Sequence, residues 1–199
     1  MGSPPDTVRL GLRERKKAKT RDAIQREALR LIAKQGYHAT TVEQIADAAE
    51  VSPSTFFRYF PTKEDVVLHD ELDPRLLESL RAQPSELGLI AALRRTMRDV
   101  FDGLSEAEAA RELQRHELAR SVPELRARTL DQYAGGLDML SQAFAERLDR
   151  PAGDVAIRAL AGAVIGVGMA AILTAGDRPE DFVEQFDAHL AQLEAGFGF

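Results

Sequence analysis

The sequence predicts an all-α protein, and three kinds of observation support this fold class. Apolar residues recur at helical spacing, as at Ile24, Ala28 and Ile32, whereas the alternating pattern of a β-strand is not found over any length. A Ser or Thr followed three residues later by Glu, Gln or Asp marks helix starts at several points. Gly and Pro separate the segments, so we expect the 199 residues to form eight or nine helices.

Residues 1–16 are rich in Pro, Gly and charge, and predict a mobile basic arm. A helix is expected over residues 17–35, with Gly36 as its natural stop. The Lys and Arg side chains around the boundary between the arm and this helix could bind in a DNA minor groove or along the phosphate backbone. The alternative is that the arm is a disordered, solubilising tail. The cations are Arg9, Arg13, Arg15, Lys16, Lys17 and Lys19.

Two short helices are predicted next. Thr41 begins a Thr-x-x-Gln capping box, which opens a helix that runs to Ala49. Ser52 is an N-cap residue and Pro53 occupies the first helical position, so a further helix begins there. Pro61 ends it.

The remaining chain predicts a series of longer helices. One begins at Thr62 and runs to about Leu80, with a kink or break at Pro74. The later helices are expected to begin at Ser85, Ser105, Ser121, Pro151 and Pro179. Those that begin at Ser85, Ser121 and Pro179 are expected to end at about Gly103, Leu148 and Ala195, respectively.

The charge is distributed unevenly. Net charge is −6, but residues 1–63 carry 12 Lys and Arg against 7 Asp and Glu, whereas residues 64–199 carry 14 against 25. A basic N-terminal part on an acidic body suggests phosphate contacts at one end, although a solvated face of uneven charge is the simpler alternative.

Several protein classes are disfavoured by composition. The absence of cysteine excludes disulfides and thiolate zinc sites and fits a reducing, cytoplasmic location. The polar N-terminus does not resemble a secretory signal peptide. Residues 159–176 are uncharged, but they are rich in Gly and Ala and reach only the lower limit of about 20 residues for a membrane span. We interpret them as a fully buried helix and expect no membrane partner.

Residues 40–63 have the layout of a helix-turn-helix DNA reader, with two short helices joined by a tight turn. In the second helix, Phe56 and Phe60 are expected to point inward with Val51. Ser54, Phe57 and Arg58 would then point outward. The alternative is that this aromatic run only forms core.

The outward residue types suit DNA. Arg58 can form two bonds to a guanine in the major groove. Ser54 and Thr55 can donate to a phosphate or a base edge, and the Tyr59 hydroxyl can donate to a phosphate. Lys63 stands at the start of the following helix, where it is placed for a phosphate.

Residues 21–63 resemble the DNA-binding domain of the TetR/AcrR family of transcriptional regulators. The residues that carry the resemblance are Arg21, Ile24, Ala28, Gly36, Thr40, Thr41, Ile45, Ala46, Ala49, Val51, Ser52, Thr55, Phe56, Tyr59, Phe60 and Lys63. The resemblance implies an Ω-shaped homodimer, a DNA-binding domain over residues 17–63 and a ligand-binding and dimerisation domain over residues 64–199. It also implies DNA contacts from Thr41, Ser54, Thr55, Phe57, Arg58, Tyr59 and Lys63.

Two positions depart from the family pattern. Glu50 stands where the family usually has Gly, so either the glutamate adopts a left-handed backbone or the turn differs. Phe57 stands where tyrosine is frequent. It cannot donate a hydrogen bond, so its contact would be apolar, for instance with a thymine methyl group.

The resemblance assigns dimerisation to the last two helices, although packing within one subunit is the alternative for either helix. A small-molecule site would lie among the preceding helices, lined by flexible or aromatic residues. Its candidates are Met97, Phe101, Tyr133, Met139 and Phe144, each of which also suits ordinary core. His116 is a further candidate for an acidic ligand group, but we expect it at the surface.

An enzyme is disfavoured, since the four histidines lack metal-ligand spacing and neither a G-x-S-x-G nor a Walker-type glycine motif occurs. We therefore predict no catalytic residue, metal or cofactor. The predicted function is a cytoplasmic, homodimeric, ligand-responsive transcriptional regulator. We favour a repressor that a small molecule releases from a palindromic operator in double-stranded DNA. The alternative is an architectural protein that binds or bends DNA without a ligand.

Overall fold

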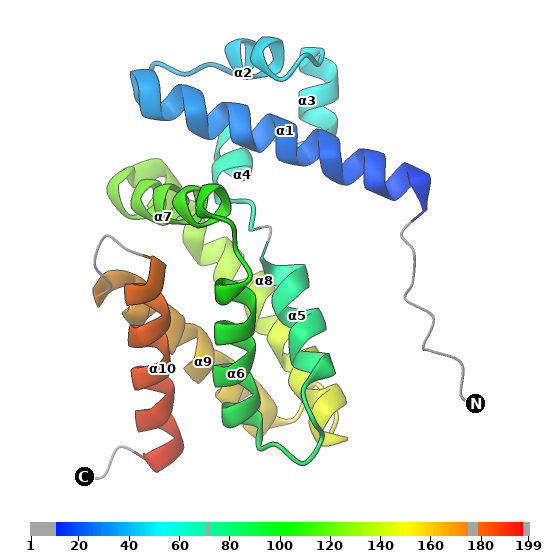
Figure 1. Cartoon of the computed structure of the whole chain (residues 1–199), viewed down its shortest axis with the longest axis vertical. Coiled ribbons are helices and arrows are strands. Elements are labelled where there is room, and N and C mark those ends of the chain that lie inside the picture. Colours follow the sequence, from blue (N-terminus) through cyan, green and yellow to red (C-terminus); the bar gives the residue numbers. More distant parts are fainter. Residues whose placement is uncertain (1–10, 71, 175–178, 197–199) are drawn as a thin grey trace. The chain divides into compact units, whose positions relative to one another are not determined.

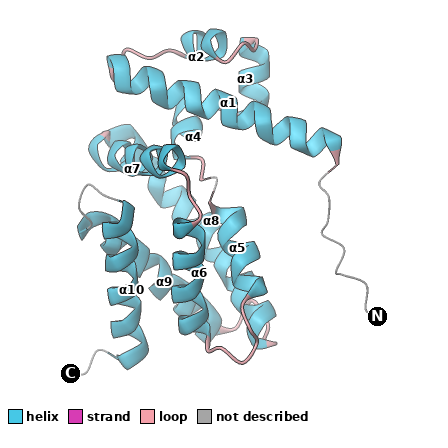
Figure 2. Cartoon of the chain, in the orientation of Figure 1, coloured by secondary structure: helices cyan, strands magenta, loops and turns pink. Residues whose placement is uncertain are grey.

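The computed structural model describes residues 11–70, 72–174 and 179–196. Every regular element in these ranges is a helix, which confirms the all-α prediction (Figures 1 and 2). The chain divides into two compact units, Met1–His69 and Asp70–Phe199, which we call the head and the body.

The head contains α1 (Leu12–Gln35), α2 (Val42–Ala48), α3 (Pro53–Tyr59) and α4 (Lys63–Leu68). Residues 12–16 were expected to belong to the arm, but they form the first turns of α1. Lys and Arg, which dominate this stretch, are good helix formers, and Gly and Pro are missing from it. Residues 1–10 of the predicted arm lie outside the described residues.

The caps expected from the sequence define the short helices. The Thr41 and Gln44 side chains form the predicted capping box of α2, and the Ser52 side chain accepts a hydrogen bond from the Thr55 amide at the start of α3. Between them, Glu50 has φ 54°, which is the left-handed backbone that a turn built for glycine requires.

The head core lies between α1 and the three short helices. It consists of Ile24, Ala28, Leu29, Ile32, Tyr37, Ile45, Ala46, Phe56, Phe60, Val66, Val67 and Leu68. Gln25 Nε2 donates to the carbonyl oxygens of Val66 (3.0 Å) and His69 (2.7 Å) and thereby joins α1 to the end of α4. This packing leaves one face of α3 uncovered within the head.

The body contains α5 (Asp73–Ala82), α6 (Leu89–Asp102), α7 (Glu106–Ser121), α8 (Pro123–Leu148), α9 (Val155–Thr174) and α10 (Pro179–Ala195). The helix expected from Thr62 to Leu80 is two helices, α4 and α5, with Pro74 in the first turn of α5. The break is therefore N-terminal to the predicted position, because proline is favoured in a first turn rather than in a helix interior.

Three other helix starts also differ from the prediction. Helix α8 begins at Pro123 with Val122 as its N-cap residue, and Ser121 is the last residue of α7. Helix α6 has Gly88 and not Ser85 at its N-cap, since residues 84–87 form a turn in which the Leu87 amide bonds to the Pro84 carbonyl. Helix α9 begins at Val155 and not at Pro151. The Asp154 side chain accepts a hydrogen bond from the Ala156 amide (2.8 Å), so aspartate acts as its start signal.

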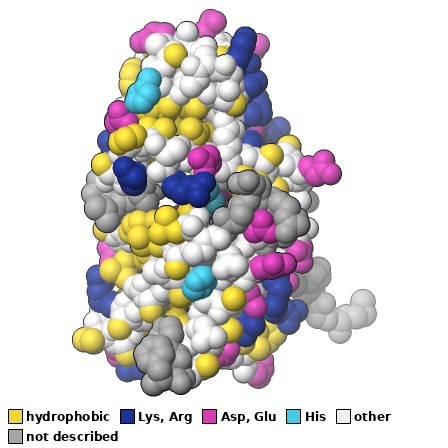
Figure 3. Space-filling model, turned by 90° about the vertical axis from the view of Figure 1, so that its left-hand side faces the viewer, with side chains coloured by type: hydrophobic (Ala, Val, Ile, Leu, Met, Phe, Trp, Pro, Cys, Tyr) yellow, Lys and Arg dark blue, Asp and Glu magenta, His cyan; other side chains and the backbone are white. Residues whose placement is uncertain are grey.

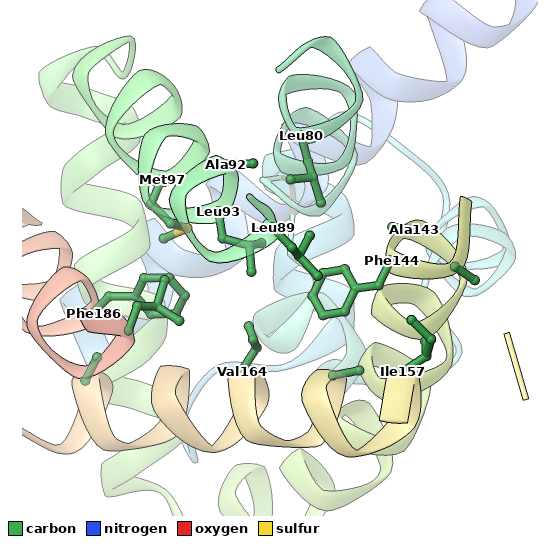
Figure 4. Close-up of a cluster of buried hydrophobic side chains, with 14 of the residues drawn as sticks. Leu80, Leu89, Ala92, Leu93, Met97, Ala143, Phe144, Ile157, Val164 and Phe186 are labelled. Atoms are coloured by element: carbon green, nitrogen blue, oxygen red, sulfur yellow. The ribbon is translucent and has the colours of Figure 1, made fainter. Parts of the chain in front are cut away.

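The body core brings residues of α5, α6, α8, α9 and α10 together (Figure 4). Arg94 of α6 forms a two-pronged ion pair with Asp187 of α10, with both N–O distances at 2.8 Å. Arg147 of α8 donates to the backbone carbonyls of the corner between α5 and α6. Its four acceptors belong to Leu80, Gln83, Pro84 and Leu87.

Helix α9 was predicted to be fully buried, and in the single chain this is wrong. Only Ile157, Ala161, Val164 and Ala171 are buried, whereas Val155 and Leu173 are 83% and 65% exposed. By length and composition alone α9 could cross a membrane, a test that core helices of soluble proteins also pass. On the face shown in Figure 3, hydrophobic side chains of the body are also open to solvent between charged ones.

Candidate nucleic-acid interface

Helix α3 presents a polar and aromatic surface because its other face is anchored in the head core. Phe56 and Phe60 are 0% and 3% exposed, as predicted, and their ring centres are 6.1 Å apart. Phe57 is 50% exposed, although its ring edge contacts Phe56. Ser54 and Arg58 are exposed as well. The structure therefore places these three predicted DNA-binding residues on the open side of α3.

Three hydroxyl groups meet at the start of α3. Ser52 Oγ lies 2.9 Å from Ser54 Oγ and donates to Thr55 Oγ1 at 3.0 Å. Ser52 Oγ also accepts from the Thr55 amide, which is the N-cap bond. The cap thus fixes the side chains of Ser54 and Thr55, whose remaining hydrogen-bonding capacity suits a phosphate or a base edge.

The Tyr59 ring lies between two guanidinium groups. Arg58 Cζ is 5.4 Å and Arg21 Cζ of α1 is 5.9 Å from the ring centre. Both distances fall within the range of a cation–π interaction. Two cations held near one ring favour a nearby anion such as a phosphate. The contribution of Arg21 was missed from the sequence, because only its family match drew attention to it.

Lys63 lies at the start of α4 as predicted, but its amine is engaged within the head. Lys63 Nζ donates to the carbonyl oxygens of Tyr37 (2.9 Å) and Thr40 (3.0 Å) and lies 4.0 Å from the centre of the Tyr37 ring. An ammonium group has three N–H donors. A phosphate contact from Lys63 therefore depends on the third.

Thr41 is exposed at the start of α2, where its hydroxyl accepts from the Gln44 amide (3.3 Å). Gln44 Oε1 in turn accepts from the Thr41 amide (3.1 Å) and from Gln35 Nε2 (2.8 Å). The Thr41 side chain is thus held in place by the cap, and its own proton is not used by these bonds.

Three of the candidate ligand-binding residues of the body share one hydrophobic cluster, which contains Met97 and Phe144 and against which Phe101 packs. Met97 and Phe144 are buried in the core, and Tyr133 and Met139 are half-buried on α8. Burial raises the pKa of Tyr133. Phe101 and His116 meet through the Phe182 ring of α10, whose centre lies 5.4 and 5.5 Å from theirs.

The expectation that His116 lies at the surface is wrong. It is half-buried, and burial together with the charge of Arg115 lowers its pKa to about 4.

A buried ion cluster beside His116 was missed from the sequence. Arg115 Nη2 lies 2.7 Å from both Asp70 Oδ2 and Glu112 Oε2, and the arginine side chain is 8% exposed. Burial and the charge of Asp70 raise the pKa of Asp73 to about 6. Two carboxylates, those of Asp70 and Glu112, thus bind one guanidinium, which joins the segment before α5 to α7.

Sequence models of known families match both units. Residues 24–69 match the model described as "Bacterial regulatory proteins, tetR family", and residues 87–198 match the one described as "MftR C-terminal domain". Together they cover the helix-turn-helix and more than half of the chain.

The chain belongs to the TetR family. Curated relatives of this TetR-family protein are transcriptional regulators. The regulator TcmR of Streptomyces glaucescens is 44% identical over 100 residues, which are 49% of this chain and 44% of TcmR. This match therefore spans less than half of TcmR. The proposed mycofactocin biosynthesis regulator MftR of Mycobacterium tuberculosis is 28% identical over 172 residues, which are 84% of this chain and 83% of MftR.

Solved structures share the TetR fold. FadR of Thermus thermophilus, a TetR-family repressor solved with lauroyl-CoA, superposes with a TM-score of 0.58 at 24% identity, covering 90% of this chain and 95% of FadR. FadR of Bacillus halodurans gives 0.55 at 21% identity, covering 90% and 96%. These likenesses support the fold, and the family assignment makes the protein a regulator of transcription rather than an enzyme.

Proposed function

We propose that this TetR-family protein is a cytoplasmic, homodimeric repressor that binds a palindromic operator through α3 and leaves it when a small molecule binds the body. The observation that carries the DNA-binding part is the open face of α3, where Ser54, Phe57 and Arg58 are exposed above the buried anchors Phe56 and Phe60. Phe57, which is 50% exposed, adds an apolar side chain to this otherwise polar face.

We assign different roles to the residues of this surface. Arg58 reads a base, and Phe57 supplies an apolar contact such as that with a thymine methyl group. Thr41, Ser54, Thr55, Tyr59 and Lys63 bind phosphates or position the helix. Arg58 starts from its place beside Tyr59 and would extend from there to reach a guanine.

The DNA-binding part can be tested by selecting preferred sites from a random library. We expect a palindrome with half-sites about one helical turn apart. Arg58→Ala should weaken the preferred site by about 1–3 kcal/mol and relax preference at one base pair of each half-site. Affinity should fall with salt, with a slope of about −7 if the dimer makes roughly eight phosphate contacts. Uniform coverage without a preferred site would instead favour the architectural protein.

The dimer part rests on the exposed face of α9. Val155, Ala159, Gly162, Gly166 and Leu173 recur at helical spacing and are all exposed in the single chain. Small residues let a second helix approach closely. We propose that this face meets a second copy of the chain. The apolar side chains Phe182, Phe186 and Leu190 of α10 are buried in the body core instead.

Gly166→Leu tests the dimer without disturbing the single chain. A Cβ added at Gly166 meets no atom within 4 Å, and the same holds for Gly135 of α8, which provides the matched control. Both changes should favour their helix by up to about 1 kcal/mol. Only Gly166→Leu should yield a monomer by analytical ultracentrifugation. A Gly166→Leu protein that stays dimeric would place the interface elsewhere.

The effector part rests on the family and on the aromatic group of Phe101, His116 and Phe182 within the body. We propose that the candidates Met97, Phe101, His116, Tyr133, Met139 and Phe144 contribute to a small-molecule site. A ligand that binds only the folded state raises the unfolding midpoint, so a thermal-shift screen combined with operator release will test it. A compound that raises the midpoint but leaves the operator occupied is not the effector.

A further inference from the structure

The first turns of α1 carry five cations, and within the described part of the head none of them forms an ion pair. They are Arg13, Arg15, Lys16, Lys17 and Lys19, and all of them are exposed. Residues 12–19 contain a single acidic residue, Glu14. Further along the same helix Arg30 Nε lies 2.6 Å from Glu27 Oε2, so cations of α1 do pair where a carboxylate is within reach. The five cations at its start are therefore available to an external anion.

The position of these cations in α1 is unfavourable in the free protein. Positive charge near a helix N-terminus is disfavoured by the helix dipole. Arg13 and Lys17 are also like charges four residues apart, which repel one another. The N-cap residue Gly11 supplies no side-chain hydrogen bond, and the buried residues of α1 begin only at Ile24. Such a departure from local preference is typical of a functional site, and an anion bound along these turns would offset the repulsion.

Three cations of α1 form a row that leads to α3. Arg13, Lys17 and Arg21 follow one another at four-residue spacing, which places them on the same side of the helix. Arg21 is the end of the row next to α3, since its Cζ atom lies 5.9 Å from the centre of the Tyr59 ring, which Arg58 also contacts. The turns before Arg21 extend past α3 (Figure 1), and Arg13 lies about 12 Å further along the helix axis. We call these three residues the α1 row.

The phosphate backbone of DNA fits the α1 row in charge and in spacing. Each strand of duplex DNA presents a phosphate about every 3.4 Å along the duplex axis, so a row of about 12 Å faces roughly three to four successive phosphates. Lys17 is a point charge on a flexible stem, which suits a phosphate better than the edge of a base. Because Arg21 already lies beside Tyr59 of α3, the row continues the candidate DNA surface along α1.

We propose that the α1 row binds the DNA phosphate backbone beside the half-site that α3 contacts, with Arg13 and Lys17 each binding a phosphate. This inference rests on the proposed DNA-binding function and adds a second contact surface to it. Arg15 is separated from both Arg13 and Lys17 by about 200° of helix rotation, so Arg15 and Lys19 lie on the side of α1 opposite to the row. The row adds affinity but no sequence preference, since every base pair carries the same phosphates.

The first experiment compares two double variants that remove the same charge from opposite sides of α1. Arg13→Gln with Lys17→Gln changes the row, and Arg15→Gln with Lys19→Gln is the matched control. All four side chains are exposed, so both variants should unfold at the midpoint of the unchanged protein. Binding to the selected operator is then measured between about 50 and 200 mM salt.

The two variants should differ in the salt slope. Loss of two phosphate contacts per subunit should make the slope of a dimer shallower by about 3.6. The affinity that the row variant loses over this salt range should therefore be on the order of 100-fold smaller than the loss for the unchanged protein. The control variant should change the slope by less than about one unit. Equal slopes for the two variants would overturn the proposal.

The second experiment asks whether the helix is needed in addition to its charge. Ala18 is exposed and lies outside the row. Proline at this position lacks an N–H and clashes with the Glu14 carbonyl, so Ala18→Pro should end the helix there while every cation remains. The helix that follows is retained, because proline is favoured in a first turn. We expect Ala18→Pro to reduce the slope as the row variant does, and Ala18→Ser to leave it unchanged. An unchanged slope for Ala18→Pro would mean that a disordered basic tail suffices, and would overturn the helical row.

Site selection separates this inference from the proposed function. The row variant should select the same sequence as the unchanged protein, whereas Arg58→Ala should relax the preference at one base pair. A changed preference in the row variant would indicate base contacts and would overturn the phosphate role. If the unchanged protein selects no preferred operator, the proposed function fails. If it selects one and the two double variants have equal slopes, only the role of the α1 row fails.

Discussion

Lys63→Met separates the structural role of this lysine from its proposed role at DNA. The change keeps an unbranched side chain but removes the ammonium group. It therefore deletes the bonds to the carbonyls of Tyr37 and Thr40 and the contact with the Tyr37 ring. These contacts therefore hold the start of α4 against the segment between α1 and α2.

The contacts set the expected size of the effect. A hydrogen bond from a charged group contributes about 1.5–3 kcal/mol, and a cation–π contact contributes about 0.5–1 kcal/mol. Lys63 is half-buried and one ammonium group makes all three contacts, so their contributions will not add in full. We expect the free energy of unfolding of the head to fall by about 2–4 kcal/mol. For a unit of this size, that lowers the midpoint by at least about 8 °C.

Thermal unfolding followed by circular dichroism measures this effect, and Lys34→Met is the control. Lys34 is an exposed lysine in the last turn of α1, and its replacement should change stability by less than about 0.5 kcal/mol. DNA binding is then measured at a temperature where both variants are folded. The salt slope of Lys63→Met should fall by at most about one unit per subunit. Equal midpoints for the two variants would refute the structural role.

Two further predictions concern stability. Glu50→Gly should stabilise the head by about 1 kcal/mol in urea unfolding, because it relieves the left-handed backbone at φ 54°. Glu50→Ala keeps the Cβ atom, so an equal gain there would point to charge instead. In the body, the raised pKa of Asp73, about 6, contributes stability that is lost as pH rises from about 4 to 6. The lowered pKa of His116, about 4, contributes stability that is lost as pH falls from about 6.5 to 4, so the two oppose each other. Urea unfolding at several pH values between about 4 and 6.5 measures these contributions. Compared with the unchanged protein, the slope of the unfolding free energy against pH should be more positive for Asp73→Asn and more negative for His116→Gln. Slopes equal to that of the unchanged protein would contradict both assignments.

The sequence predicted those features that depend on neighbouring residues. The caps at Thr41, Ser52 and Ser105 are local signals, and each begins a helix in the structure. The inward and outward faces of α3 follow from helical periodicity alone. Phe56 and Phe57 are adjacent residues of the same type, and the pattern assigned one to the core and the other to the surface.

Contacts between distant residues could not be predicted in this way. Lys63 bonds to carbonyls 26 and 23 residues earlier, and Arg115 pairs with Asp70 across 45 residues. A lysine at a helix start looks the same in sequence whether it contacts phosphate or the protein itself. The burial of α9 was also misjudged. Hydropathy shows that the helix is apolar, but it does not show whether its apolar side chains are covered by the same chain.

The capping of the α5–α6 corner by Arg147 has a consequence for the order in which the chain folds. The acceptor nearest to Arg147 in sequence, the Leu87 carbonyl, is 60 residues away, so this bond closes a long loop. During synthesis α5 and α6 emerge first, and their corner lacks its hydrogen-bond donor until α8 has been made. We therefore expect the corner to be set late, when α8 docks and not when α5 and α6 first meet. One arginine near the end of α8 thus makes the first hairpin of the body dependent on residues synthesised after it.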